Sequence, residues 1–186
     1  MSEKPKIKVA TAWLGGCSGC HMSILDIDER ILDLIEVVEF NKSPINDIKT
    51  FTRDCDIGLI EGGCCNDENV HTLIEFRKHC GVLVAMGECA IMGGLPSLRN
   101  GIQLSECLRE AYLEGPTVVD ANPLRIIPSD PDIPRILDRV YPCHEVVKID
   151  YSLPGCPPRA DLIWEALTAL VAGREPVFTD ESFRYD

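Results

Sequence analysis

Residues 7–20 read IKVATAWLGGCSGC, and this stretch decides the fold. Its first half, 7–13, is rich in apolar and β-branched residues and predicts a strand. Its second half is a glycine-rich turn, and residues 21–35 after it repeat apolar side chains at helical spacing. A strand, a tight turn and a helix are the opening unit of a parallel sheet that is covered by helices.

The same alternation continues along the chain. Further strands are predicted at 37–40, 56–61, 81–86 and 145–149, and further helices at 66–78, 103–113 and 159–171. The proline-rich stretch 116–142 is predicted to run over the surface. These elements predict one α/β domain over residues 1–186, with helices on both faces of a parallel sheet. Ligands of such sheets bind beyond the carboxyl ends of the strands.

Composition limits the class of protein. Lys and Arg number 18 against 30 Asp and Glu, which gives a formal net charge of -12 and argues against a nucleic-acid binder. No segment is apolar for long enough to span a bilayer, and residues 1–8 lack the apolar core of a signal peptide and a twin-Arg motif. We therefore expect a cytoplasmic protein. In that reducing compartment, ten cysteines indicate metal binding or redox chemistry rather than disulfides.

Cys17 and Cys20 form a CxxC pair on the glycine-rich turn. Two thiols three positions apart can bind one metal centre, and the glycines allow the backbone to approach it closely. The helix that follows would direct its free N–H groups at the thiolates and stabilise their charge. Taken alone, the pair is equally compatible with a metal cluster, a thioredoxin-like dithiol and a zinc site.

Two isolated cysteines change this balance. Cys89 follows the apolar strand 81–86 and has glycines on both sides. Cys156 lies in the run PGCPP at 154–158, whose prolines fix φ and remove backbone donors, so that the loop is a rigid mount for one side chain. Three loops thus present four thiols at one edge of the sheet. This distribution favours an iron–sulfur cluster, although spacing alone leaves zinc open.

Other residues near this edge are candidates with competing interpretations. Glu61 ends a strand there, and it either forms a hydrogen bond near the cluster, relays protons, binds an iron atom after oxidation, or is a polar strand end. Cys64 or Cys65 is an alternative ligand or, more simply, part of local packing. His21 donates a hydrogen bond toward a cluster sulfide or lies exposed on its helix. For the pair Cys143-His144 a structural role is favoured over a metal site.

Four motifs together resemble the small subunits of [NiFe] hydrogenases. They are WLxxCxGC at 13–20, EG at 61–62, GxCAxxGG at 87–94 and PGCPP at 154–158. The likeness extends from Ile7 to about Gly173 and is greatest for the short soluble small subunits of NAD-coupled, multi-subunit hydrogenases. It implies a flavodoxin-like fold and a proximal [4Fe–4S] cluster. The ligands of that cluster would be Cys17, Cys20, Cys89 and Cys156.

The resemblance also implies partners and marks differences from larger relatives. A large subunit would carry the Ni–Fe site, and further iron–sulfur and FMN-bearing diaphorase subunits would reduce NAD(P). Larger small subunits have a second cysteine-rich region, but no cysteine follows Cys156, so one cluster is expected. They also commonly have Glu where this chain has Met22, which puts a proton route through that position in doubt.

We therefore expect an oxidoreductase subunit that carries electrons from the Ni–Fe site through one cluster toward the diaphorase, with no catalytic residue of its own. The nearest alternative is the related cluster-bearing subunit of respiratory complex I, which shares the PGCPP loop but begins its site with two adjacent cysteines. A dithiol oxidoreductase that uses Cys17 and Cys20, and a scaffold with structural zinc, are the alternatives from other classes.

Overall fold

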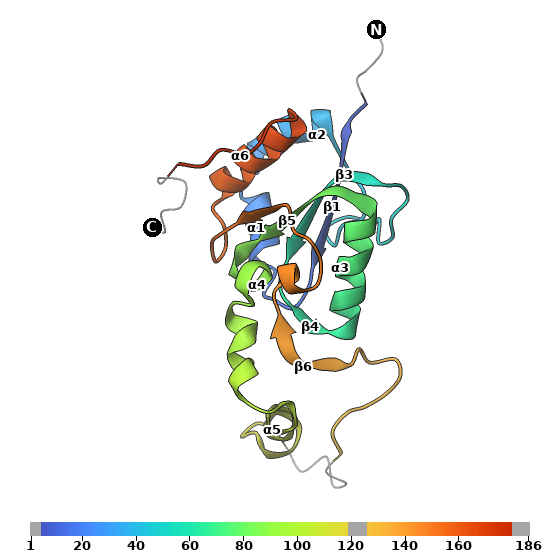
Figure 1. Ribbon diagram of the computed structural model, residues 1–186, viewed down its shortest axis with the longest axis vertical. Coiled ribbons are helices and arrows are strands. Elements are labelled where there is room, and N and C mark those ends of the chain that lie inside the picture. Colours follow the sequence, from blue (N-terminus) through green and yellow to red (C-terminus); the bar gives the residue numbers. More distant parts are fainter. Residues whose placement is uncertain (1–4, 119–125, 180–186) are drawn as a thin grey trace.

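The structure is a computed structural model that describes residues 5–118 and 126–179. A parallel sheet of five strands forms its centre, in the order β2-β1-β3-β5-β7 (Figure 1). The strands are β1 (Ile7–Trp13), β2 (Val38–Phe40), β3 (Cys55–Glu61), β5 (Cys80–Met86) and β7 (Tyr151–Leu153). Counted within this sheet alone, the order is 2-1-3-4-5, which is that of flavodoxin. The predicted α/β, flavodoxin-like class is therefore confirmed.

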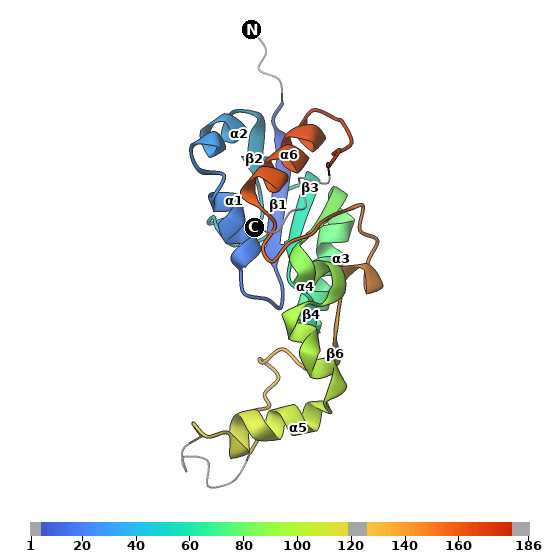
Figure 2. The same cartoon turned by 90° about the vertical axis from the view of Figure 1, so that its left-hand side faces the viewer.

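Helices cover both faces of the sheet, as predicted (Figures 1 and 2). On one face α1 (Gly19–Leu25), α2 (Ile31–Val37) and α6 (Ala160–Val171) pack on a core that includes Leu59 of β3 and Ile163 of α6. On the other face α3 (Asp67–His79) contributes Leu73 and Phe76 to a second core. The Asn66 side chain accepts the Asn69 N–H at 2.8 Å and so caps α3.

The single helix predicted over 21–35 is wrong, because the chain breaks it into two. Helix α1 ends at Leu25, a 3₁₀ turn η1 (Asp28–Arg30) follows, and α2 begins at Ile31. Asp28 has a φ of 62°, and Asp is one of the residues that tolerate this left-handed conformation. The turn places Ile27, which is 1% exposed, in the core between the two helices.

The strand predicted at 145–149 is also wrong. A 3₁₀ turn η4 (Cys143–Glu145) and irregular chain occupy this region, and the ladder to β5 begins only at Tyr151, opposite Val84. The Asp150 carboxylate accepts the Leu83 N–H at 2.9 Å. A side chain therefore occupies the β5 donor that a backbone carbonyl of the predicted strand would have accepted. The apolar run in 145–149 is explained instead by packing of its side chains against the α3 core.

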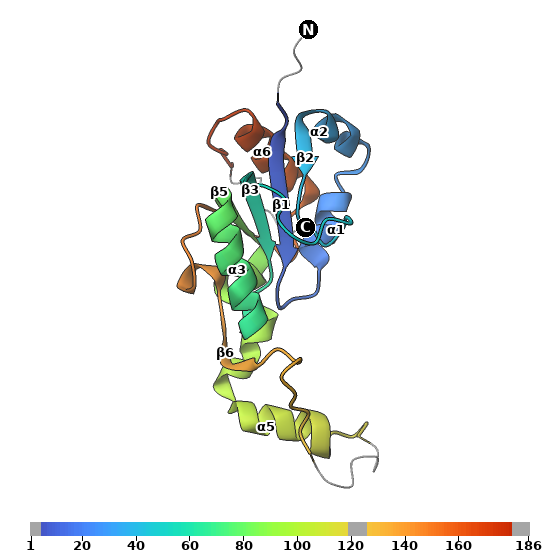
Figure 3. The same ribbon diagram turned by 90° about the vertical axis from the view of Figure 1, so that its right-hand side faces the viewer.

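Residues 95–118 and 126–141 build a projection that the sequence did not show (Figures 2 and 3). Residues that were expected in a loop after β5 form α4 (Gly87–Met92), followed by the 3₁₀ helix η2 (Leu95–Gly101). The helix predicted at 103–113 is α5 (Leu104–Arg109), continued by the π-helical turn η3 (Glu110–Glu114). Within the stretch expected to be only a surface excursion, β6 (Ile136–Tyr141) pairs antiparallel with β4 (Cys64–Asn66). Residues 119–125 of that stretch lie outside the described residues.

The Asn100 side chain imitates a strand partner for β6. Its amide donates to the Val140 carbonyl at 2.9 Å, and its carbonyl oxygen accepts the Val140 N–H at 2.7 Å. This pair fixes η2 against β6, and thereby joins α4 to the base of the projection. In the part of the chain that the structure describes, no helix combines the length and the apolar character needed to cross a membrane.

Candidate metal centre

The four candidate ligands lie at the carboxyl ends of three strands. Cys17 is exposed in the loop after β1, and Cys20 is buried in the first turn of α1. Cys89 is half-buried in α4, directly after β5. Cys156 is exposed in the loop after β7. Because all the strands of this sheet run parallel, these ends share the edge at which such folds bind their ligands.

The thiols are close enough to act on one another electrostatically. Burial raises the pKa of the Cys20 thiol well above its usual value, and negative charge on Glu61, Cys17, Cys89 and Cys156 raises it further. Burial also raises the pKa of Cys89, with Cys156 and Cys17 among the other causes. The fold therefore gathers four thiols from positions far apart in the chain, as the sequence predicted.

Backbone geometry around the thiols depends on glycine. Gly87, at the start of α4, has a φ of 78°, and a Cβ built on it would lie 2.4 Å from Cys20 Sγ. A side chain at this position would therefore displace the sulfur. The Gly19 N–H donates to Cys17 Sγ at 3.4 Å, so the start of α1 provides one of the expected N–H donors.

Glu61 and His21 form a buried pair beside Cys20. Glu61 Oε2 accepts the backbone N–H of His21 at 2.8 Å and lies 2.5 Å from His21 Nδ1. His21 Nε2 lies 3.0 Å from Thr11 Oγ1, which in turn lies 2.7 Å from Ser43 Oγ. His21 is fully buried, so the interpretation that it lies exposed is wrong. Both of its ring nitrogens contact protein oxygens, which leaves neither for a cluster sulfide.

The remaining cysteines near the edge take part in packing. Cys64 and Cys143 are both fully buried in the α3 core, and the Cys143 thiol donates to the Gly62 carbonyl at 3.4 Å. Cys65 Sγ lies over Gly15, only 2.1 Å from where a Cβ on that glycine would stand. These contacts support the packing interpretation. An alternative-ligand role for Cys64 or Cys65 stays a prediction.

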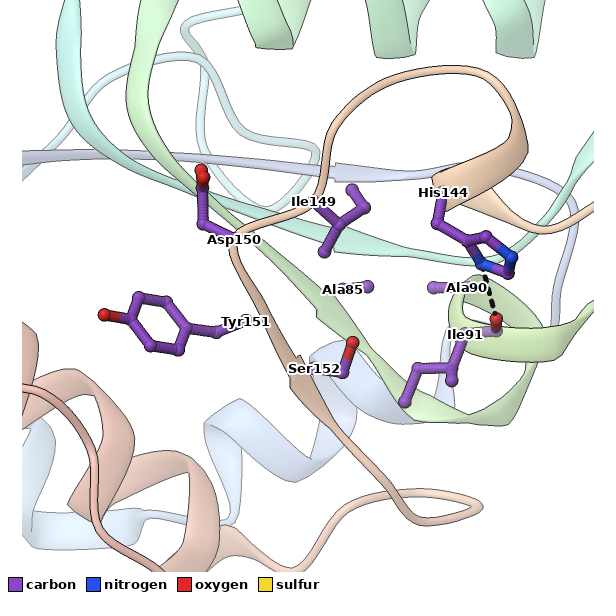
Figure 4. A pocket seen from close by; sticks show the side chains of 8 residues that line it. All are labelled: Ala85, Ala90, Ile91, His144, Ile149, Asp150, Tyr151 and Ser152. Carbon is purple, nitrogen blue, oxygen red and sulfur yellow. Dashed lines mark hydrogen bonds between the residues drawn. The ribbon is translucent and has the colours of Figure 1, made fainter.

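Cys143 and His144 do not point at a common centre. His144 is exposed, and its Nδ1 donates to the Ile91 carbonyl at 3.1 Å, away from Gly62. It lines a cavity of about 270 Å³ between α4 and β7 (Figure 4). The structural role favoured from the sequence agrees with this divergence.

The four thiols leave two kinds of metal centre to compare. Among the residues that the structure describes, no group of three or more His, Cys, Asp or Glu side chains is arranged to hold a metal ion. Ligands of a single zinc ion converge on it at about 2.0–2.3 Å. The thiolates of a [4Fe–4S] cluster each bind a different iron atom and stand further apart. Four cysteine thiolates are a known donor set for either kind of centre.

Comparison with known proteins places the chain in a family. The family model described as "NADH ubiquinone oxidoreductase, 20 Kd subunit" matches residues 17–170, a span that contains all four cysteines. The chain belongs to this family. Relatives that match it along nearly its whole length, however, carry hydrogenase names.

One such relative is "NAD-reducing hydrogenase HoxS subunit delta" of Cupriavidus necator, which is 49% identical over 185 residues, covering 100% of this chain and 88% of the relative. A solved structure described as "NAD+-reducing [NiFe]-hydrogenase in the H2-reduced state" matches with a TM-score of 0.92 and 48% identity, covering 98% of this chain and 100% of that one. The resemblance to small subunits of NAD-coupled [NiFe] hydrogenases is therefore confirmed.

A third relative is longer. It is a subunit of the F420-non-reducing hydrogenase of Methanothermobacter thermautotrophicus, 42% identical over 172 residues, which cover 91% of this chain and 55% of the relative. This chain thus spans about half the length of that relative. Between the two interpretations that share the PGCPP loop, the hydrogenase subunit is favoured over the complex I subunit, because hydrogenase subunits match this chain along its whole length.

Proposed function

We propose that this chain is the electron-transfer small subunit of a cytoplasmic [NiFe] hydrogenase, and that Cys17, Cys20, Cys89 and Cys156 hold one [4Fe–4S] cluster. The observation that carries the proposal is the grouping of these four thiols at one sheet edge, in a chain 49% identical to a NAD-reducing hydrogenase subunit. The donor set fits, because four cysteine thiolates are the usual ligands of such a cluster. When bound, the cluster supplies one-electron transfer.

The residues of this chain would hold and shield the cluster. Cys20 is buried, and burial of a ligand excludes water and so influences the reduction potential. The Gly19 N–H, bound to Cys17 Sγ, stabilises negative charge on that sulfur. Burial raises the pKa of the free Cys20 thiol, so it carries a proton that would be released when the sulfur binds a metal as a thiolate.

We further propose that the cluster edge is covered by a large subunit that carries the Ni–Fe site, where dihydrogen is split. Large apolar side chains exposed beside this edge support a protein partner there; they are Trp13, Met92, Leu95 and Leu98. Electrons would then pass to an iron–sulfur subunit and an FMN-bearing diaphorase that reduces NAD(P), as the name of the NAD-reducing relative suggests. Ten free thiols agree with a cytoplasmic location.

The dithiol oxidoreductase is the weaker alternative. That function gives no role to Cys89 and Cys156. A complex I-like subunit is favoured only by the description of the family model.

Replacement of single cysteines tests the proposal. The chain is purified with its partner subunits without oxygen, and iron, acid-labile sulfide and the reduced-state electron paramagnetic resonance spectrum are measured. Cys156→Ser should remove about four iron atoms per complex and one spectral component. Cys143→Ser is the matched control, because this thiol is buried on the Gly62 carbonyl, and it should leave both unchanged. Equal iron in Cys156→Ser and the wild type would refute the assignment.

A further inference from the structure

Two segments that carry candidate ligands are bonded to each other directly. Glu88 immediately precedes Cys89, and Gly155 immediately precedes Cys156. The Glu88 backbone N–H donates to the Gly155 carbonyl at 3.1 Å. In return, the Gly155 N–H donates to Glu88 Oε1 at 3.0 Å. One residue thus satisfies both backbone groups of a glycine that lies 67 positions further along the chain.

The close approach of these segments leaves little freedom for either. Gly155 has a φ of 139°, and a Cβ on it would lie 2.5 Å from the Pro158 Cα, so no other residue fits there. A Cβ on Gly87 would lie 3.3 Å from the Gly155 carbonyl oxygen. Glu88 stands in the first turn of α4, directly before Cys89.

The loop that carries Cys156 is held at its two ends by different helices. At one end Glu88 of α4 binds Gly155, and at the other the Ser23 hydroxyl of α1 donates to the Pro158 carbonyl. Cys156 stands exposed between these two points. The position of its thiol relative to Cys89 therefore depends on the Glu88–Gly155 bonds.

We propose that Glu88 is a positioning residue that sets the separation of Cys89 and Cys156 before the cluster binds. This inference rests on the proposed function, since it takes both cysteines as ligands. Glu88 directly precedes Cys89 in the chain and acts through the backbone of Gly155 on Cys156. Its role is to place an acceptor oxygen at the correct distance from the Gly155 N–H, and this matters more than its charge.

Three substitutions separate reach from charge. Glu88→Ala removes the acceptor, and outer-shell partners of metal ligands typically contribute about 10–100-fold in metal affinity. We expect iron release to a chelator to be at least about 10-fold faster in this variant. Glu88→Gln keeps an acceptor oxygen at the same reach, so its release rate should stay near the wild-type rate. Glu88→Asp keeps the charge but is one methylene shorter, so it should behave like Glu88→Ala.

The measurement uses the whole complex, purified without oxygen, with iron release and the reduced-state spectrum as readouts. Glu36→Ala is the matched control, because Glu36 is exposed on α2 and its removal changes the net charge equally. The inference is overturned if Glu88→Ala releases iron at the wild-type rate, or if Glu88→Gln releases iron faster than Glu88→Asp. If the Glu88→Ala protein does not accumulate, the comparison of the iron-release rates of Glu88→Gln and Glu88→Asp decides alone. A wild-type complex without this cluster would refute the proposed function instead.

Discussion

Replacing Gly87 by alanine should abolish cluster binding while the domain stays folded. The new Cβ would lie 2.4 Å from Cys20 Sγ, and ordinary contact begins at 3.4 Å, so the sulfur must move by about 1 Å. The new Cβ cannot move away from the sulfur instead, because the Gly155 carbonyl oxygen stands 3.3 Å from the same Cβ. Metal–ligand distances are held to about ±0.2 Å, so the displacement is about five times what a ligand tolerates.

A second glycine separates this steric effect from backbone strain. Gly87 has a φ of 78° and Gly173 a φ of 69°, and an L-residue in the left-handed region costs about 1–2 kcal/mol. A Cβ on Gly173 meets nothing within 4 Å. Gly173→Ala should therefore lower the free energy of unfolding by that amount alone and keep its iron.

Iron and sulfide analysis of the purified complexes, together with thermal unfolding, checks both variants. We expect Gly87→Ala to lose about four iron atoms per complex and Gly173→Ala to lose none. A Gly87→Ala complex with full iron and an unchanged reduced-state spectrum would show that Cys20 Sγ is not held against Gly87 as a ligand. Iron loss in both variants would show that strain, and not the contact with the sulfur, is responsible.

Two further predictions concern stability. Although burial raises it, hydrogen bonds from Arg77 at 2.6 Å and from the Leu83 N–H at 2.9 Å hold the pKa of Asp150 below its usual value. Asp150→Asn should therefore lower the free energy of unfolding, measured in urea above pH 4, by about 1.5–3 kcal/mol. The difference between the variant and the wild type should vanish as the pH falls through the lowered pKa of Asp150, because the carboxylate is then protonated. A difference that stays constant with pH would contradict this reasoning. Thr11→Val removes the hydroxyl next to His21 Nε2 and should lower the free energy of unfolding by about 1–3 kcal/mol without loss of iron. Loss of iron would show that the contact between Thr11 and His21 also affects the candidate ligands.

The sequence was sufficient for four of the five strands of the sheet, because these strands follow from short-range patterns. Apolar strands that alternate with helices have few possible arrangements, and parallel strands bring their carboxyl ends to one edge. Cys17 and Cys89 each follow a strand that the sequence predicts, so their placement at one edge could be predicted without any coordinates, whereas β7 before Cys156 was not predicted.

What the sequence did not reveal depends on partners distant in the chain. The strand expected at 145–149 fails because the Asp150 side chain replaces a backbone partner of β5. The pairing of β4 with β6 joins segments that are each too short to be recognised alone. Glu88 was missed for the same reason, since its partner Gly155 lies 67 positions away. An acidic residue beside one candidate ligand and a glycine beside another were the only signals.

The unequal burial of the four cysteines gives the proposed site two sides. Cys20 is 8% exposed and is backed by the buried pair of Glu61 and His21, whereas Cys17 and Cys156 are exposed. A cluster on these thiols would be shielded by this chain on one side only. Because solvent exposure shifts the potential of an iron–sulfur cluster, the subunit that covers the exposed side would help to set that potential. In the proposed site this chain would therefore fix the ligand geometry, and the covering subunit would contribute to the potential.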